Sequence, residues 1–127
     1  MSEQIYIAEL HNDHTLWLSE LSLGKDQLKS YKNRLEEVAK ANTGNDVLAL
    51  VEQFQNRFIR ENEVIDILLH DIRADESTIS ASAAINNVAT DRRKVSDNDD
   101  LRSRMVDFRK IFDDLKMEFI RFLAKTY

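Results

Sequence analysis

The sequence contains no proline and no cysteine, and its only glycines are Gly24 and Gly44. A β-sheet protein of this size would need more turn-forming residues, so we expect the chain to be almost entirely helical. The lack of cysteine excludes disulfides, thiolate metal ligands and cysteine nucleophiles. No stretch approaches the ~20 apolar residues of a membrane span, and no signal peptide is visible at the N-terminus.

The charge balance is acidic, with 23 Asp and Glu against 18 Lys and Arg and a net charge of −5. Nonspecific binding to nucleic acid or to an anionic membrane depends on positive charge, so we expect neither kind of partner. The 127 residues, 43% of them apolar, fit one domain with a real core, residues 1–127. We expect a soluble, cytoplasmic protein.

A helical pattern of apolar residues organises the chain. Between residues 45 and 90 they recur at alternating steps of three and four, which is the pattern of a helix packed against other helices. Glu61 and Asp75 are the polar interruptions. The apolar positions of this stripe are Val47, Val51, Phe54, Phe58, Ile65, Leu68, Ile72 and Ile79.

The same pattern before and after this stretch predicts three helices, at about residues 8–41, 46–90 and 97–126. Residues 42–45 (NTGN) form the clearest turn, where Gly44 can adopt a left-handed conformation. The second link is expected at 91–96, with Ser96 or Asp97 capping the last helix. The predicted fold is all-α: three long antiparallel helices, up-down-up, in a coiled-coil-like bundle.

Two features of the first helix leave alternatives open. Residues 1–12 are either its first turns or an extended arm packed on the bundle. Gly24 interrupts the apolar stripe without shifting it, which favours a straight helix with a small residue facing a bulky partner. The alternative is a break at Gly24, with Asp26 capping a new helix.

The helix lengths suggest self-association. If the chain reverses near Lys94, the last helix covers the central helix only from about Glu61 onward. Large apolar residues at the other end would then stay uncovered, and such a patch usually marks an interface. We therefore expect a homodimer or a protein partner there. If instead the helices bend or the second turn lies earlier, a monomer closes its own core. The predicted interface residues are Tyr31, Leu35, Val38, Val47, Val51, Phe54 and Phe58.

The three histidines are the only candidate metal ligands of note. His11 and His14 share a helix face, and the first hairpin brings His70 about one turn from them. Two imidazoles and a carboxylate could hold Zn²⁺ or Fe²⁺. His70, however, falls on the far side of its helix. We favour a buried His14 that hydrogen-bonds a carboxylate, with His11 and His70 on the surface, and we expect no cofactor.

Other charged residues suggest structural roles. Glu61 lies level with Gly24, where a buried carboxylate would have a raised pKa, but we expect it to pair with a Lys or Arg or to reach solvent. Basic residues near the second turn are expected to form a solvated cap of salt bridges with nearby aspartates. They are Arg92, Arg93, Lys94, Arg102, Arg104, Arg109 and Lys110.

Three segments, residues 11–17 (HNDHTLW), 33–38 (NRLEEV) and 54–59 (FQNRFI), resemble a group of small, uncharacterised helical proteins of bacteria. The resemblance covers about residues 5–75. It implies a cytosolic bacterial protein and brings no catalytic or binding residues.

These observations predict a non-enzymatic helical interaction or scaffold module that self-associates. The alternative is a metal-binding helical bundle that uses His14 with His11 or His70. We find no catalytic residues, no phosphate-binding loop and no nucleophile motif.

Overall fold

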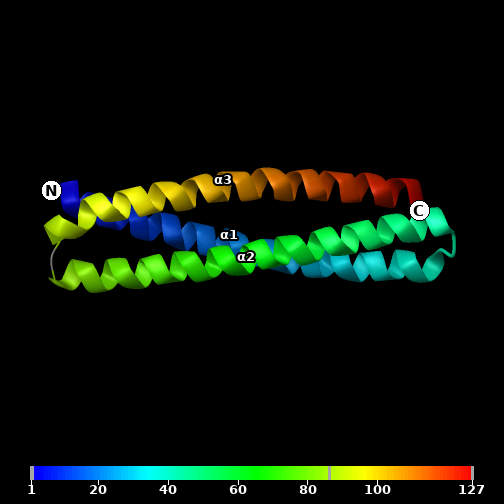
Figure 1. The fold of residues 1–127 in the computed structure, drawn as a ribbon, viewed down its shortest axis with the longest axis horizontal. Helices are drawn as coiled ribbons and strands as arrows, with labels where there is room; N and C mark the ends of the chain where they lie inside the picture. Colours follow the sequence, from blue (N-terminus) through cyan, green and yellow to red (C-terminus); the bar gives the residue numbers. More distant parts are fainter. Residues whose placement is uncertain (1, 86, 127) are drawn as a thin grey trace.

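The computed structural model describes the backbone of residues 2–85 and 87–126 and the side chains of residues 7–81 and 98–126. It consists of three long α-helices, α1 (Ser2–Ala41), α2 (Asn45–Ile85) and α3 (Asn87–Thr126). The helices run side by side in up-down-up order, so the two chain ends lie at opposite ends of the rod (Figure 1). The predicted all-α bundle is confirmed. None of the helices, within the described residues, has an apolar stretch sufficient to cross a membrane.

The first turn lies where the sequence predicts it. Asn42 Nδ2 donates to the Val38 carbonyl at 2.9 Å, which satisfies one of the free acceptors at the end of α1. The Gly44 carbonyl accepts the first hydrogen bond of α2, from the Leu48 N–H at 3.0 Å. Gly44 does not take a left-handed conformation, because no described residue has a positive φ. It precedes α2 as its cap instead.

The second reversal lies earlier than predicted. α2 ends at Ile85 and α3 begins at Asn87, so the predicted link at 91–96 and the predicted start at 97 are wrong. Ser96 and Asp97 lie within α3. The segment contains neither Pro nor Gly, so nothing in it prevents a helix, and its acidic and hydroxyl residues only resemble a cap. The side chains of Arg92, Arg93 and Lys94 lie outside the described residues.

The earlier turn lets α3 run along the whole of α2. Phe54 of α2 packs against Phe119 and Phe122 of α3, with ring centroids 5.4 and 5.1 Å apart. Phe58 meets Phe119 edge-on at 5.1 Å. Tyr31 of α1 also contacts Phe119, at 5.4 Å, so all three helices meet in this aromatic cluster.

This packing removes the reason for placing an interface at that end. Among the predicted interface residues, the core of the single chain buries Leu35, Val38, Phe54 and Phe58. The others are partly buried against the same core: Tyr31, Val47 and Val51. The end is covered by α3, because the second turn lies earlier, as the alternative anticipated. Self-association itself stays a prediction.

Gly24 lies in the middle of a continuous α1, so the predicted straight helix is confirmed and the break is not present. A Cβ at this position would lie 3.5 Å from both Ile65 and Phe108 and 3.6 Å from Phe112. The missing side chain therefore makes room for bulky residues of both neighbouring helices.

Candidate functional site

Two of the buried polar residues, His14 and Asn98, lie toward the end of the bundle that holds the start of α1. His14, with 1% of its side chain exposed, lies between two acidic residues of α2. Its Nδ1 is 3.0 Å from Glu76 Oε2, and its Nε2 is 3.2 Å from Asp75 Oδ2. Both acceptors are carboxylate oxygens, so the imidazolium form, with a proton on each nitrogen, satisfies both contacts. The predicted buried, hydrogen-bonded His14 is confirmed.

The surroundings of His14 favour its protonated form. Burial alone would lower its pKa, but the hydrogen bonds and negative charges of Asp75 and Glu76 raise the pKa above its ordinary value. Burial would likewise raise the pKa of Glu76, yet the hydrogen bonds from His14 and His11 hold it below its usual range. The cluster is thus a charged group held inside the bundle.

His11 and His70 take the surface positions expected of them. His11 is 64% exposed and contacts the other oxygen of Glu76. His70 is exposed and lies beside Asp71, 3.3 Å away, so it does not join the cluster. Among the described side chains, no group of three or more His, Asp or Glu is placed to hold a metal ion. Metal binding by His14 with His11 stays a prediction; a metal would have to displace the imidazolium proton of His14.

A second network joins α1 to α3 next to this cluster. Asp13 accepts hydrogen bonds from Asn98 at 3.2 Å and from Arg102 at 2.6 Å. Asn98 is buried, and its Oδ1 has no hydrogen-bond partner. Three of the basic residues form salt bridges, as predicted, but to neighbouring helices and not as a cap at the second turn: Arg102 pairs with Asp13, Arg104 with Asp71 and Arg109 with Glu20.

Glu61 departs from the expectation that it would pair with a base or reach solvent. It lies in the core stripe of α2 and is only 4% exposed, and its Oε2 is buried without a hydrogen-bond partner. Burial raises its pKa, more than the charges of Arg57 and Arg60 lower it. A buried polar atom without a partner is costly, so this position calls for a functional explanation.

Glu61 lies at the edge of a groove of about 270 Å³ between α2 and α3. Ile67 and Ile111, 56% and 54% exposed, lie on its two sides. We call this surface the α2–α3 groove. It is lined by Glu61, Val64, Ile67 and Leu68 of α2 and by Arg104, Asp107, Phe108 and Ile111 of α3.

Asp107 of α3 lines the α2–α3 groove, and Asp100 and Asp114 lie one heptad before and after it on the same helix. Asp100, Asp107 and Asp114 are seven residues apart and exposed, so they form one stripe along the helix. Asp100 has a weak contact with Arg104 at 3.9 Å. Among the described residues, no basic side chain pairs with Asp107 or Asp114. The α2–α3 groove therefore combines exposed isoleucines with two acidic groups, Glu61 and Asp107, while the basic residue in its lining, Arg104, already pairs with Asp71.

The sequence pattern missed two of these polar residues. Glu76 lies one position beyond the stripe of α2, where apolar spacing gives no signal. Asn98 lies seven residues before Met105, so extending the stripe of α3 back by one heptad would have found it.

No family model matches the chain, and no curated protein or solved structure is significantly similar to it. The resemblance to small helical proteins of bacteria therefore stays a prediction.

Proposed function

We propose that this protein is a non-enzymatic interaction module that binds a basic amphipathic helix in the α2–α3 groove. The observation that carries the proposal is the pairing of exposed Ile67 and Ile111 with Glu61, a buried carboxylate with an unpartnered oxygen. A fourth helix laid in the groove would cover the two isoleucines. A Lys or Arg on that helix would reach the acidic groups.

Charge complementarity selects a basic partner over a second copy of the chain. If two copies packed α3 against α3 across this groove, the stripes that contain Asp107 and Asp114 would face each other. Like charges held together oppose association. A helix with Lys or Arg beside its apolar face meets no such repulsion. Self-association through another face remains a separate prediction, which the mass of the protein in solution tests.

A synthetic peptide of about 18 residues, five helical turns, tests the proposal. It carries Leu at the heptad core positions and Lys at the others, and an acidic twin carries Glu in place of every Lys. Fluorescence anisotropy of each labelled peptide gives its affinity. We expect the basic peptide to bind one-to-one and the acidic twin not to bind.

Surface variants locate the binding site. Ile111→Ser should weaken binding of the basic peptide by roughly five- to ten-fold, because about half an isoleucine side chain is buried on binding. Leu16→Ser removes a similarly exposed side chain from α1, at 67% exposure, and serves as the matched control. Equal binding of both peptides, or equal effects of both variants, would refute the proposal.

A further inference from the structure

A second groove lies between α1 and α2, away from α3, and its volume is about 560 Å³. The buried residues Leu28 and Phe58 form its apolar floor. Lys25, Lys29 and Lys32 of α1 line it together with Asn62 of α2. We call it the lysine groove. Asp26 and Glu63 also belong to the lining, so two carboxylates partly offset the three lysines.

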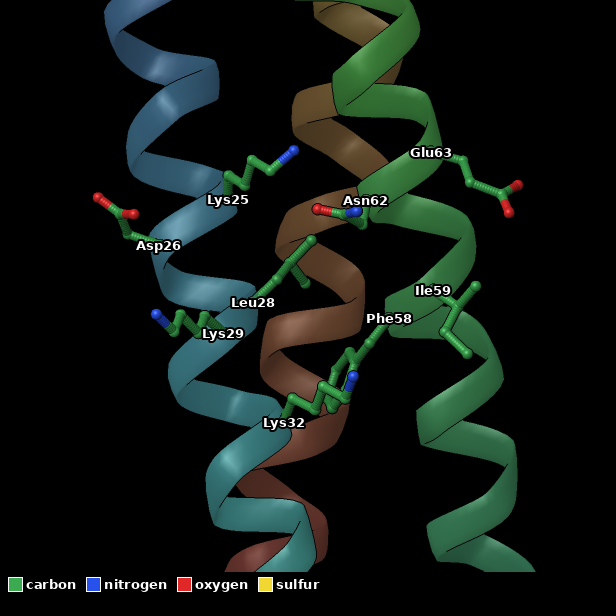
Figure 2. Close-up of a pocket in the computed structure, with 9 residues that line it drawn as sticks. All are labelled: Lys25, Asp26, Leu28, Lys29, Lys32, Phe58, Ile59, Asn62 and Glu63. Atoms are coloured by element: carbon green, nitrogen blue, oxygen red, sulfur yellow. The ribbon is translucent and has the colours of Figure 1, made fainter.

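The side chains around the lysine groove divide into two sets (Figure 2). Lys25 extends across the groove toward Asn62, and Lys32 extends toward Phe58. The remaining rim residues point outward, away from the space between the helices. They are Asp26, Lys29, Ile59 and Glu63. The groups that face the interior are thus two ammonium groups, one amide and an apolar floor.

The two inward lysines differ in their partners. Lys25 forms an ion pair with Asp66, on the α2 side. Among the described residues, no carboxylate lies within ion-pair distance of Lys32. Lys32 therefore places an uncompensated positive charge over an apolar surface. An anion bound there would gain a charge-assisted hydrogen bond.

We propose that the lysine groove binds a small anionic amphiphile, a molecule with a carboxylate, sulfate or phosphate head and an apolar chain. The head would lie at Lys32 and the chain along Leu28 and Phe58 toward Asn62. Lys25 and Lys32 are seven residues apart, about 10 Å along the helix, which matches a medium-length alkyl chain. This site is separate from the α2–α3 groove, so it does not depend on the proposed helix partner.

Isothermal titration calorimetry with sodium decanoate, below its micelle-forming concentration, tests this proposal on the full chain. We expect one-to-one binding of decanoate. Acetate supplies the same head without the chain, and decylammonium supplies the chain with the opposite charge; we expect neither to bind. Binding of decylammonium as strong as that of decanoate would overturn the proposal, because it would indicate nonspecific adsorption.

Two lysine variants assign the site. Lys32→Gln should weaken decanoate binding by roughly three- to ten-fold, through loss of the charged contact. Lys29→Gln removes the same charge one turn away. The Lys29 side chain points out of the groove, so this variant should leave the affinity for decanoate almost unchanged. Both positions are exposed, so circular dichroism should show both variants folded.

A separate experiment distinguishes a free anionic amphiphile from the headgroup of a lipid in a membrane. The protein is sedimented with phospholipid vesicles that contain phosphatidylglycerol, and it should stay in the supernatant. Binding to the vesicles without binding to free decanoate would overturn the proposal, since the lysines would then form a membrane-surface patch. Equal effects of the Lys32 and Lys29 variants on decanoate binding would also overturn it.

Discussion

His14 and Asp75 occupy core positions on antiparallel helices, and His14 Nε2 lies 3.2 Å from Asp75 Oδ2. Each residue interrupts the apolar stripe of its own helix, and the two interruptions meet across the first hairpin. A slip of α1 against α2 by one heptad would leave both groups buried without this partner, at a cost of several kcal/mol. The pair therefore specifies the register of the first hairpin, which an apolar stripe alone fixes weakly.

The first prediction concerns loss of this pair. His14→Ala should lower the free energy of unfolding by about 3–5 kcal/mol, because it removes the buried cation that contacts both Asp75 and Glu76. Urea denaturation followed by circular dichroism measures the change. His11→Ala, at the exposed neighbour on Glu76, is the control and should cost less than about 1 kcal/mol. Equal losses would contradict the assignment of His14 as the buried cation.

The second prediction is the pH dependence of stability. The pKa of His14 is raised in the folded state, so its contribution is fully present below about pH 6.5, the ordinary histidine value, and is lost as the pH rises through the folded pKa. The pKa of Glu76 is lowered, so its contribution is lost as the pH falls through its folded value. Stability should therefore peak on the acidic side of neutrality and decline toward alkaline pH.

Urea midpoints measured across this range check the profile, and His14→Gln should flatten the alkaline decline. Because that variant could fold poorly, NMR titration of the imidazole in the unmodified protein provides a second measurement. A His14 that titrates below the ordinary histidine value would contradict the prediction. A large rise in melting temperature on adding Zn²⁺ at neutral pH, lost in His14→Ala, would instead favour the metal-binding alternative.

Much of the fold follows from the spacing of apolar residues, and the first hairpin follows from Gly44. The alternating steps of three and four determine which face of each helix is buried. The second turn could not be placed in the same way, since no Pro or Gly marks it. The basic triplet at 92–94 suggested a link but is compatible with a helix. Placing the second turn there shortened the last helix, and that shortening led to the predicted interface.

The candidate site was only partly predictable. His14 could be assigned to the core because it falls on the stripe, and its need for a carboxylate follows from its polarity. Whether Glu61 finds a partner depends on which side chains of α3 lie opposite, and that depends on the misplaced second turn. The lysines of the lysine groove lie just outside the stripe of α1, so their positions depend on how α1 and α2 pack.

The third prediction tests whether the aromatic cluster around Phe54 is the core of one chain or an interface between two copies. Phe54 contacts Phe58, Phe119 and Phe122 within one chain. Phe54→Ala should therefore lower the free energy of unfolding by about 3–5 kcal/mol, without changing the mass of the folded protein in solution. Denaturation and light scattering after size-exclusion chromatography measure the two quantities. Conversion of a dimer into a stable folded monomer would restore the predicted interface.

The fourth prediction concerns Glu61. Its raised pKa means that stability falls as the pH rises from the ordinary glutamate value through the folded value. Glu61→Leu removes the unsatisfied oxygen and should raise stability at neutral pH by about 1–3 kcal/mol. It should also weaken binding of the basic peptide. Glu63→Leu, two residues away at an exposed position, is the control and should change neither the stability nor the affinity for the basic peptide. Loss of stability in Glu61→Leu would contradict the prediction.

The fifth prediction concerns the gap that Gly24 leaves between the three helices. Gly24→Ala should stabilise the protein by about 1 kcal/mol, because alanine is the better helix former and its Cβ would meet Ile65, Phe108 and Phe112 at ordinary contact distances of 3.5–3.6 Å. Gly24→Leu should instead destabilise it by about 1–3 kcal/mol, since the extra atoms would overfill a packed layer. Thermal denaturation of both variants checks the pair. If leucine were tolerated as well as alanine, this layer would hold a void, and the close approach of α3 to α1 would not depend on the glycine.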